Sequence, residues 1–158
     1  MGIDFELWEL PKAPQRKIKG VGYSSVYLMN EDKATLSYKL WKQMIDLCYG
    51  IGDYYDKRRK GRKFECCNSW LDYQKFLKWF NSNTKEFQRD DMVLTKCVIS
   101  KDNTTYNPNN CAVVPKEISV YLERENPNMD RAKELAETYK DCITDDIYEL
   151  LTEDFYYE

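Results

Sequence analysis

Two segments of the chain carry apolar residues at helical spacing, and they limit the possible folds more than any other feature. Between Lys33 and Tyr49, apolar residues recur every three or four positions, as Leu36, Leu40, Met44 and Leu47. Residues 70–81 repeat this spacing with a largely aromatic face, made of Trp70, Tyr73, Phe76, Leu77 and Phe80. Residues three or four positions apart lie on one side of an α-helix, so both segments are predicted to be helices that share a core.

The rest of the chain alternates short apolar segments with breaks, which predicts short strands among further helices. Residues 92–99 are mostly apolar, residues 112–114 are entirely so, and both segments follow turn residues, as expected of strands. Pro115 suits the first turn of a helix, and residues 129–143 and 145–151 again show helical spacing. We therefore expect an α+β protein with short strands, several helices and a C-terminal helix pair.

Charge is distributed unevenly, although the 158-residue chain has a formal net charge of only −3. Residues 123–158 contain 12 acidic and 4 basic side chains, whereas residues 1–122 contain 20 basic and 15 acidic ones. The basic side chains concentrate in residues 53–63, an expected loop, and include Arg58, Arg59, Lys60, Arg62 and Lys63. Such a patch is suited to phosphate. Because Gly61 lies within the run, a solvated loop is the favoured interpretation.

Six cysteines and no histidine set limits on the chemistry. Histidine is the usual general base near neutral pH, so its absence excludes Ser-His and Cys-His catalysis. No Cys-x-x-Cys pair occurs, which favours free thiols over a zinc site. We expect no metal and no cofactor. The chain has neither an 18-residue apolar run nor a secretory pattern, so we expect a cytoplasmic protein without membrane contact.

Several motifs, taken in order, resemble those of bacteriophage HNH homing endonucleases. The matching pieces are Gly20-Val21-Gly22-Tyr23, Trp41 and Met44 with Cys48-Tyr49, Cys67 and Trp70 with Phe76 and Trp79, and the segment from Leu94 to Pro115, which ends in the run from Tyr106-Asn107-Pro108 to Pro115. Residues 133–150 are similar to the C-terminal helix pair of that family. The resemblance implies a small HNH-like (ββα) body at residues 20–125. An N-terminal arm, residues 1–19, would precede it, and an acidic C-terminal helical segment, residues 126–158, would follow.

The chain departs from the HNH pattern where a nuclease needs its metal ligands and its base. Thr95 and Cys97 stand where the resemblance implies carboxylates, and Lys96 stands where a histidine would act. A hydroxyl and an uncharged thiol cannot replace carboxylates as ligands of a hard cation. Residues 123–128 are also too few for the family's DNA-binding module, whose three strands need about 5 residues each. No catalytic residue is therefore expected, and we interpret the chain as a degenerate nuclease rather than an enzyme.

The first hypothesis is a phage protein that binds and inhibits a host defence nuclease, such as a CRISPR effector, in the host cytoplasm. An acidic helical surface could occupy the nucleic-acid channel of such a partner. Its candidate contacts are Asp141, Asp145, Asp146, Glu149, Glu153, Asp154 and Glu158. The same residues could instead form an ordinary solvated helix face. Phe155, Tyr156 and Tyr157 are further candidates for an interface.

Two other functions remain as alternatives. A nucleic-acid-binding protein would place Arg58, Arg59, Lys60, Arg62 and Lys63 on phosphates, with Tyr54 and Tyr55 available for stacking. A residual nuclease would need Asp90 and Asp91 as carboxylates from a shifted register, although an exposed turn before the strand is the favoured interpretation of this pair.

Overall fold

The computed structural model describes residues 17–86, 88–96, 98 and 104–153. In chain order its elements are α2 (Asn30–Lys33), α3 (Leu36–Tyr49), α4 (Asp53–Arg59), β1 (Glu65–Cys66), the 3-10 helix η1 (Asn68–Leu71), α5 (Tyr73–Ser82), β2 (Met92–Thr95), β3 (Thr105–Tyr106), β4 (Ala112–Pro115), α6 (Lys116–Arg124), α7 (Met129–Tyr139) and α8 (Asp145–Thr152). Several helices with a few short strands confirm the predicted α+β class. Most of the expected N-terminal arm, residues 1–16, lies outside the described residues.

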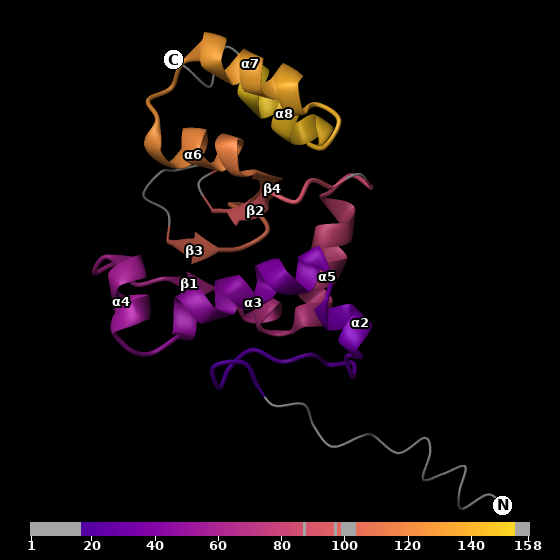
Figure 1. The fold of residues 1–158 in the computed structure, drawn as a ribbon, viewed down its shortest axis with the longest axis vertical. Helices are drawn as coiled ribbons and strands as arrows, with labels where there is room; N and C mark the ends of the chain where they lie inside the picture. Colours follow the sequence, from indigo (N-terminus) through magenta and orange to yellow (C-terminus); the bar gives the residue numbers. More distant parts are fainter. Residues whose placement is uncertain (1–16, 87, 97, 99–103, 154–158) are drawn as a thin grey trace, which may run out of the picture.

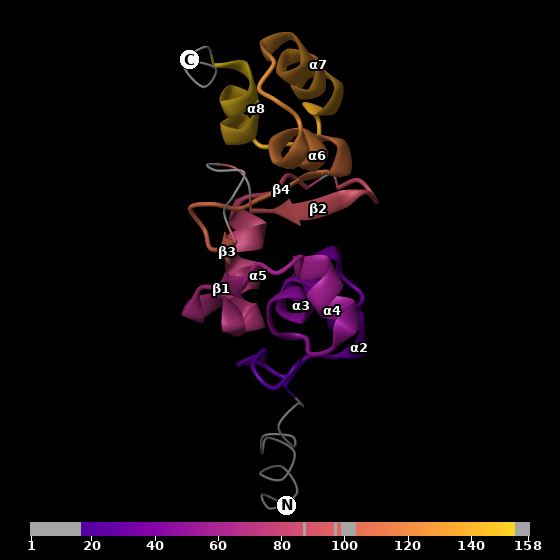
Figure 2. The same cartoon turned by 90° about the vertical axis from the view of Figure 1, so that its left-hand side faces the viewer.

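Two small sheets lie in the middle of the structure, between two groups of helices (Figures 1 and 2). Strands β2 and β4 pair antiparallel, with Met92 opposite Pro115 and Thr95 opposite Ala112. Strands β1 and β3 pair in parallel. In both views α6, α7 and α8 lie on one side of β2 and β4, and α2, α3 and α4 lie on the other, with β1 packed against α3. Strands β2 and β4 and the following helix α6 form the strand–strand–helix arrangement that the sequence predicts. We call these three elements the strand–strand–helix centre.

Helices α3 and α5 meet through aromatic side chains that are almost completely buried. Trp41, Trp70, Tyr73 and Phe76 are each at most 2% exposed. The Trp41 indole N–H donates a hydrogen bond of 2.7 Å to the backbone carbonyl of Trp70, and the rings of Trp70 and Phe76 meet edge to face at 5.0 Å. Buried indoles need such a polar partner. The predicted apolar faces of both helices are confirmed.

Both long helices begin later than the hydrophobic pattern suggests, because short polar side chains cap them. Thr35 accepts a hydrogen bond from the Tyr38 N–H, so α3 starts at Leu36 rather than Lys33. Asp72 accepts from the Gln74 N–H at 3.0 Å, so α5 starts after the η1 turn rather than at Trp70. A capping oxygen satisfies an N–H that the helix itself leaves unpaired. Strand β2 likewise ends at Thr95, whereas the apolar pattern extends to residue 99.

Helix α7 is fastened to α6 by a polar network around Arg131. Its guanidinium lies 3.3 Å from Glu117 and 3.5 Å from Glu125. Tyr139 donates a hydrogen bond of 2.7 Å to Glu117. Exposed ion pairs contribute little to stability. The burial of Leu135, which is 1% exposed, therefore contributes more than this network to the stability of the helix in its place. The C-terminal helices thus share one hydrophobic core with the rest of the described chain.

Replacing Phe76 by alanine should lower the free energy of unfolding by roughly 3–5 kcal/mol, because it leaves a cavity in the core beside Trp70 and Trp79. Urea denaturation followed by circular dichroism measures the change. Tyr54→Ala is the matched control, since this ring is 65% exposed, and it should stay within about 0.5 kcal/mol of the wild type. Equal losses in the two variants would contradict this account of the core.

Candidate functional site

A groove of about 540 Å³ lies where the strand–strand–helix centre faces α3 and the segment after α4. Six cationic side chains line it: Arg58, Lys60, Arg62, Lys96, Lys116 and Arg124. Among its described lining residues, Glu123 is the only carboxylate. Within the described part of the chain, none of these six cations forms an ion pair. We call this feature the basic groove. Its positive charge is therefore free to meet a negatively charged ligand.

Lys96 is held in the basic groove by aromatic rings. Lys96 comes directly after strand β2 and is only 8% exposed. Its Nζ lies 4.7 Å from the centre of the Phe64 ring and 5.4 Å from that of Tyr106. An ammonium over aromatic faces is stabilised without a negative partner. The cage therefore fixes the position of Lys96 and leaves its charge uncompensated.

The expectation that residues 53–63 form a loop is wrong for residues 53–59, which form helix α4. The helix ends at Lys60 and Gly61, whose φ angles of 51° and 77° place both in the left-handed region. Such a C-terminal turn, favoured by glycine, reverses the chain direction. Arg58 then rests on the Tyr54 ring at 5.8 Å and Arg62 on the Phe64 ring at 5.1 Å. The turn thus brings cations from both of its sides to the basic groove.

The five basic residues singled out in this segment divide into two groups. Arg58, Lys60 and Arg62 line the basic groove. Arg59 instead donates hydrogen bonds to the carbonyls of Cys48, at 3.1 Å, and Gly50, which tie α4 to the end of α3. Its role is therefore structural. Lys63 lines a neighbouring cavity of about 520 Å³, which Arg62 also borders.

Three cations of the basic groove are not part of that basic segment. Lys96 comes from the end of β2, and Lys116 and Arg124 lie on α6. Each stands apart from the other groove cations in the sequence, so no local charge pattern marks it. Only the pairing of β2 with β4, which places α6 beside β2, reveals that they converge.

The degenerate nuclease positions have different surroundings. Thr95 is fully buried, opposite Ala112 in the β2–β4 pair. Lys96, the next residue, lies in the basic groove. Cys97 lies outside the described residues. The end of β2 therefore presents an ammonium to the groove, at the place where the HNH resemblance implies catalytic groups.

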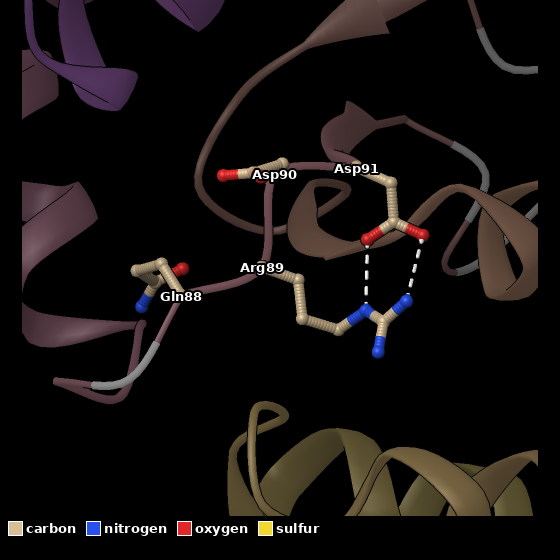
Figure 3. Close-up of a pocket in the computed structure, with 4 residues that line it drawn as sticks. All are labelled: Gln88, Arg89, Asp90 and Asp91. Carbon is tan, nitrogen blue, oxygen red and sulfur yellow. Dashed lines mark hydrogen bonds and ion pairs between the residues drawn. The ribbon is translucent and has the colours of Figure 1, made fainter.

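Asp90 and Asp91 line a separate shallow cavity of about 380 Å³, together with Gln88 and Arg89 (Figure 3). Arg89 donates two hydrogen bonds to the Asp91 carboxylate, at 2.9 and 3.4 Å, and they hold the pKa of Asp91 below its usual range. The Asp90 side chain points away from this pair (Figure 3). The Asp91 carbonyl also accepts the Lys116 N–H at 3.0 Å. Asp91 thus fixes the start of β2 against α6, and the basic groove receives neither carboxylate.

The acidic candidates lie around α8, beyond α6 from the sheets (Figure 1). Asp141, Asp145, Asp146 and Glu149 are exposed and Glu153 is half-buried. No ion pair joins any of these five to another described residue. Asp145 and Asp146 occupy the first turn of α8, where negative charge suits the helix dipole. Asp154, Glu158 and the aromatic residues 155–157 lie outside the described residues.

Metal sites and membrane spans are both absent from the part of the chain that the structure describes. Among these residues, no group of three or more cysteine, aspartate and glutamate side chains is placed to hold a metal ion. None of the described helices is both long and apolar enough to cross a membrane.

Comparisons with protein-family models, with curated proteins and with solved structures found no match to this chain. Its class is therefore defined by its own geometry: an α+β protein with a basic groove between its strand–strand–helix centre and its N-terminal helices. The HNH resemblance stays a prediction.

The thiols offer a direct test of the local structure beside the groove. Burial raises the pKa of the Cys66 thiol to about 11, whereas the adjacent Cys67 is half-exposed. Because the thiolate is the reactive form, iodoacetamide at pH 8 should modify Cys67 much faster than Cys66. Labelling rates of Cys66→Ser and Cys67→Ser variants, read by mass spectrometry, separate the two sites. The Cys66 rate should rise as the pH approaches 11; equal rates at pH 8 would contradict the burial of Cys66.

Proposed function

We propose that this protein binds the phosphate backbone of nucleic acid in the basic groove and does not cleave it. The observation that carries the proposal is the convergence of six cations on one concave surface that has a single carboxylate among its described lining residues. They come from three separate parts of the chain, residues 58–62, Lys96 and α6. A solvated basic loop would explain the cations of residues 58–62 but not the presence of cations from distant segments in the same groove.

Phosphate is the ligand that best fits this charge. Lysine and arginine side chains bind phosphate oxygens and release condensed counterions, which makes affinity strongly dependent on salt. Contacts of this kind position a nucleic acid but do not read its sequence. Although the chain is acidic overall, the positive charge is concentrated locally, and a cleft focuses the field of its own charges. We therefore expect binding with little sequence preference.

Binding without cleavage is supported by the chemistry of the residues that face the groove. Cleavage of a phosphodiester by a metal-dependent nuclease needs a metal to polarise the phosphate and a base to activate water. The end of β2 supplies Lys96 there, and α6 supplies Ser119 and Glu123. A lysine ammonium cannot accept a proton or bind a cation, so Lys96 serves attraction rather than hydrolysis.

Replacing both Lys116 and Arg124 by glutamine should weaken binding to all sequences alike. The plot of log affinity against log salt should become less steep by about 0.7–0.9 for each phosphate that the variant no longer neutralises. Fluorescence anisotropy with a labelled oligonucleotide measures both effects. Lys133→Gln is the matched control, because Lys133 is an exposed lysine of α7 outside the groove. Wild-type protein that fails to bind at low salt would refute the proposal.

A second candidate function is the inhibition of a host defence nuclease, such as a CRISPR effector, by a phage protein in the host cytoplasm. The exposed carboxylates around α8 favour it, because Asp141, Asp145, Asp146 and Glu149 have no ion-pair partner among the described residues. Carboxylates on a helical surface could engage the lysines and arginines of a partner's nucleic-acid channel. In this case the partner is a protein, and the basic groove is not the contact.

Affinity capture from host lysate, with and without nuclease treatment, separates the two functions. If the acidic surface binds a protein, a discrete host protein should remain after nuclease treatment. It should be lost when Asp145 and Asp146 become asparagine and Glu149 becomes glutamine, because these changes remove the charge without much change of shape. Asp130→Asn is the control, as an exposed first-turn aspartate on α7. Retention of the protein by the triple variant would exclude the acidic surface as its contact.

A further inference from the structure

We infer that the basic groove takes single-stranded rather than double-stranded nucleic acid, and that the exposed side chains of Ile51 and Tyr54 contact its unpaired bases. This inference rests on the proposed binding of nucleic acid and specifies its substrate class. It follows from the apolar part of the groove, its size and the position of these two side chains.

The basic groove combines its cations with apolar lining residues. Half-buried residues from three elements are among them: Leu47 of α3, Val93 and Leu94 of β2, and Val120 of α6. A duplex stacks its bases inside and turns sugars and phosphates outward, so it has little to place on an apolar surface. A single strand exposes the faces of its bases as well as its phosphates. A groove lined by both cations and apolar side chains can therefore contact the phosphates and the bases of a single strand.

The size of the groove points the same way. Its volume of about 540 Å³ falls within the range of small-molecule sites, about 300–1,000 Å³. A site of that size can receive the base and sugar of an unpaired nucleotide. A duplex, whose major groove alone is about 12 Å wide, is too wide to enter the groove and would leave its apolar lining residues uncovered.

Tyr54 lies beside the phosphate-binding cations and exposes most of its ring. Its side chain is 65% exposed, and the Arg58 guanidinium carbon lies 5.8 Å from the ring centre. The Arg58 Nη1 also lies 3.5 Å from the Tyr54 hydroxyl. Because Arg58 lines the groove, this contact places the ring at the groove's edge. An aromatic ring next to an arginine can stack a base while the arginine binds a phosphate.

Ile51 extends this surface on the other side of Arg62. It is 93% exposed and lines the neighbouring cavity of about 520 Å³, together with Lys63. Arg62 borders both this cavity and the basic groove. Cations thus continue from α6 across the groove to Lys63, with apolar side chains beside them. This is the arrangement expected of a surface that follows one flexible strand.

Tyr55, the other tyrosine that the sequence suggests for stacking, is half-buried and has a structural role. Its ring meets that of Tyr54 edge to face at 5.1 Å, and Lys19 lies 5.0 Å from its centre. It also fills the space above Gly50, where an added Cβ would come within 2.6 Å of the ring. The Tyr55 ring therefore packs against the Tyr54 ring, and of the two only Tyr54 is exposed enough to stack on a base.

The test compares a labelled single-stranded oligonucleotide with the same strand annealed to its complement, at one fixed salt concentration. The full-length wild-type protein should bind the single strand more tightly. Tyr54→Ala should weaken single-strand binding by about 5- to 150-fold, which corresponds to the loss of one stacked base, and should leave duplex binding unchanged. Tyr54→Phe should retain affinity, because it keeps the ring. Tyr27→Ala is the matched control, as another exposed tyrosine outside the groove.

A second readout reports stacking directly. An oligonucleotide that carries 2-aminopurine should change its fluorescence on binding to the wild type and much less on binding to Tyr54→Ala. Equal or tighter binding of the duplex that still depends on Lys116 and Arg124 would overturn this inference and leave the proposed function standing. Absence of binding to either oligonucleotide at low salt would refute both.

Discussion

The packing of α3 against α5 is the contact on which the rest of the structure depends. Buried aromatic rings contribute large apolar areas, and the rings of Trp41 and Tyr73 meet at 5.3 Å where the two helices touch. The hydrogen bond from the Trp41 indole to the Trp70 carbonyl joins α3 to the η1 turn that precedes α5. The C-terminal end of α3 then holds the end of α4 in place, since Arg59, the last residue of α4, donates hydrogen bonds to the carbonyls of Cys48 and Gly50. One wall of the basic groove is thus an extension of the aromatic core.

The other wall depends on a different kind of contact. The Lys116 N–H donates to the carbonyl of Asp91, while the Asp91 carboxylate holds Arg89, which in turn lies over the Tyr139 ring. This chain of contacts joins the start of β2, the start of α6 and the end of α7. Helix α7 therefore supports the part of the fold that carries Lys96 and Arg124, even though its residues do not line the groove.

The sequence was sufficient for the features that repeat at regular spacing, and insufficient for those that arise from tertiary contacts. The buried faces of α3 and α5 follow from apolar periodicity, and the strand–strand–helix order follows from short apolar segments. Helix α4 was missed because its residues are polar and its stability comes from contacts to α3. Only half of the groove's cations could be predicted from the sequence, where Arg58, Lys60 and Arg62 form a charge cluster. The other three, Lys96, Lys116 and Arg124, lie near them only because β2 pairs with β4. The roles of Arg59 and Tyr55 were likewise indistinguishable from those of their neighbours.

The uncompensated charge of the groove has a consequence for the protein without a ligand. Like charges gathered on one surface repel each other, so the arrangement that favours an anionic ligand opposes the folded state. Lys96 reduces this cost through its aromatic cage, and dissolved salt screens the remainder. A ligand that binds only the folded chain adds stability in proportion to the logarithm of its concentration above the dissociation constant. If the proposed polyanion binds, we therefore expect it to hold the segment after α4 and helix α6, which carry the cations on opposite walls, more firmly together.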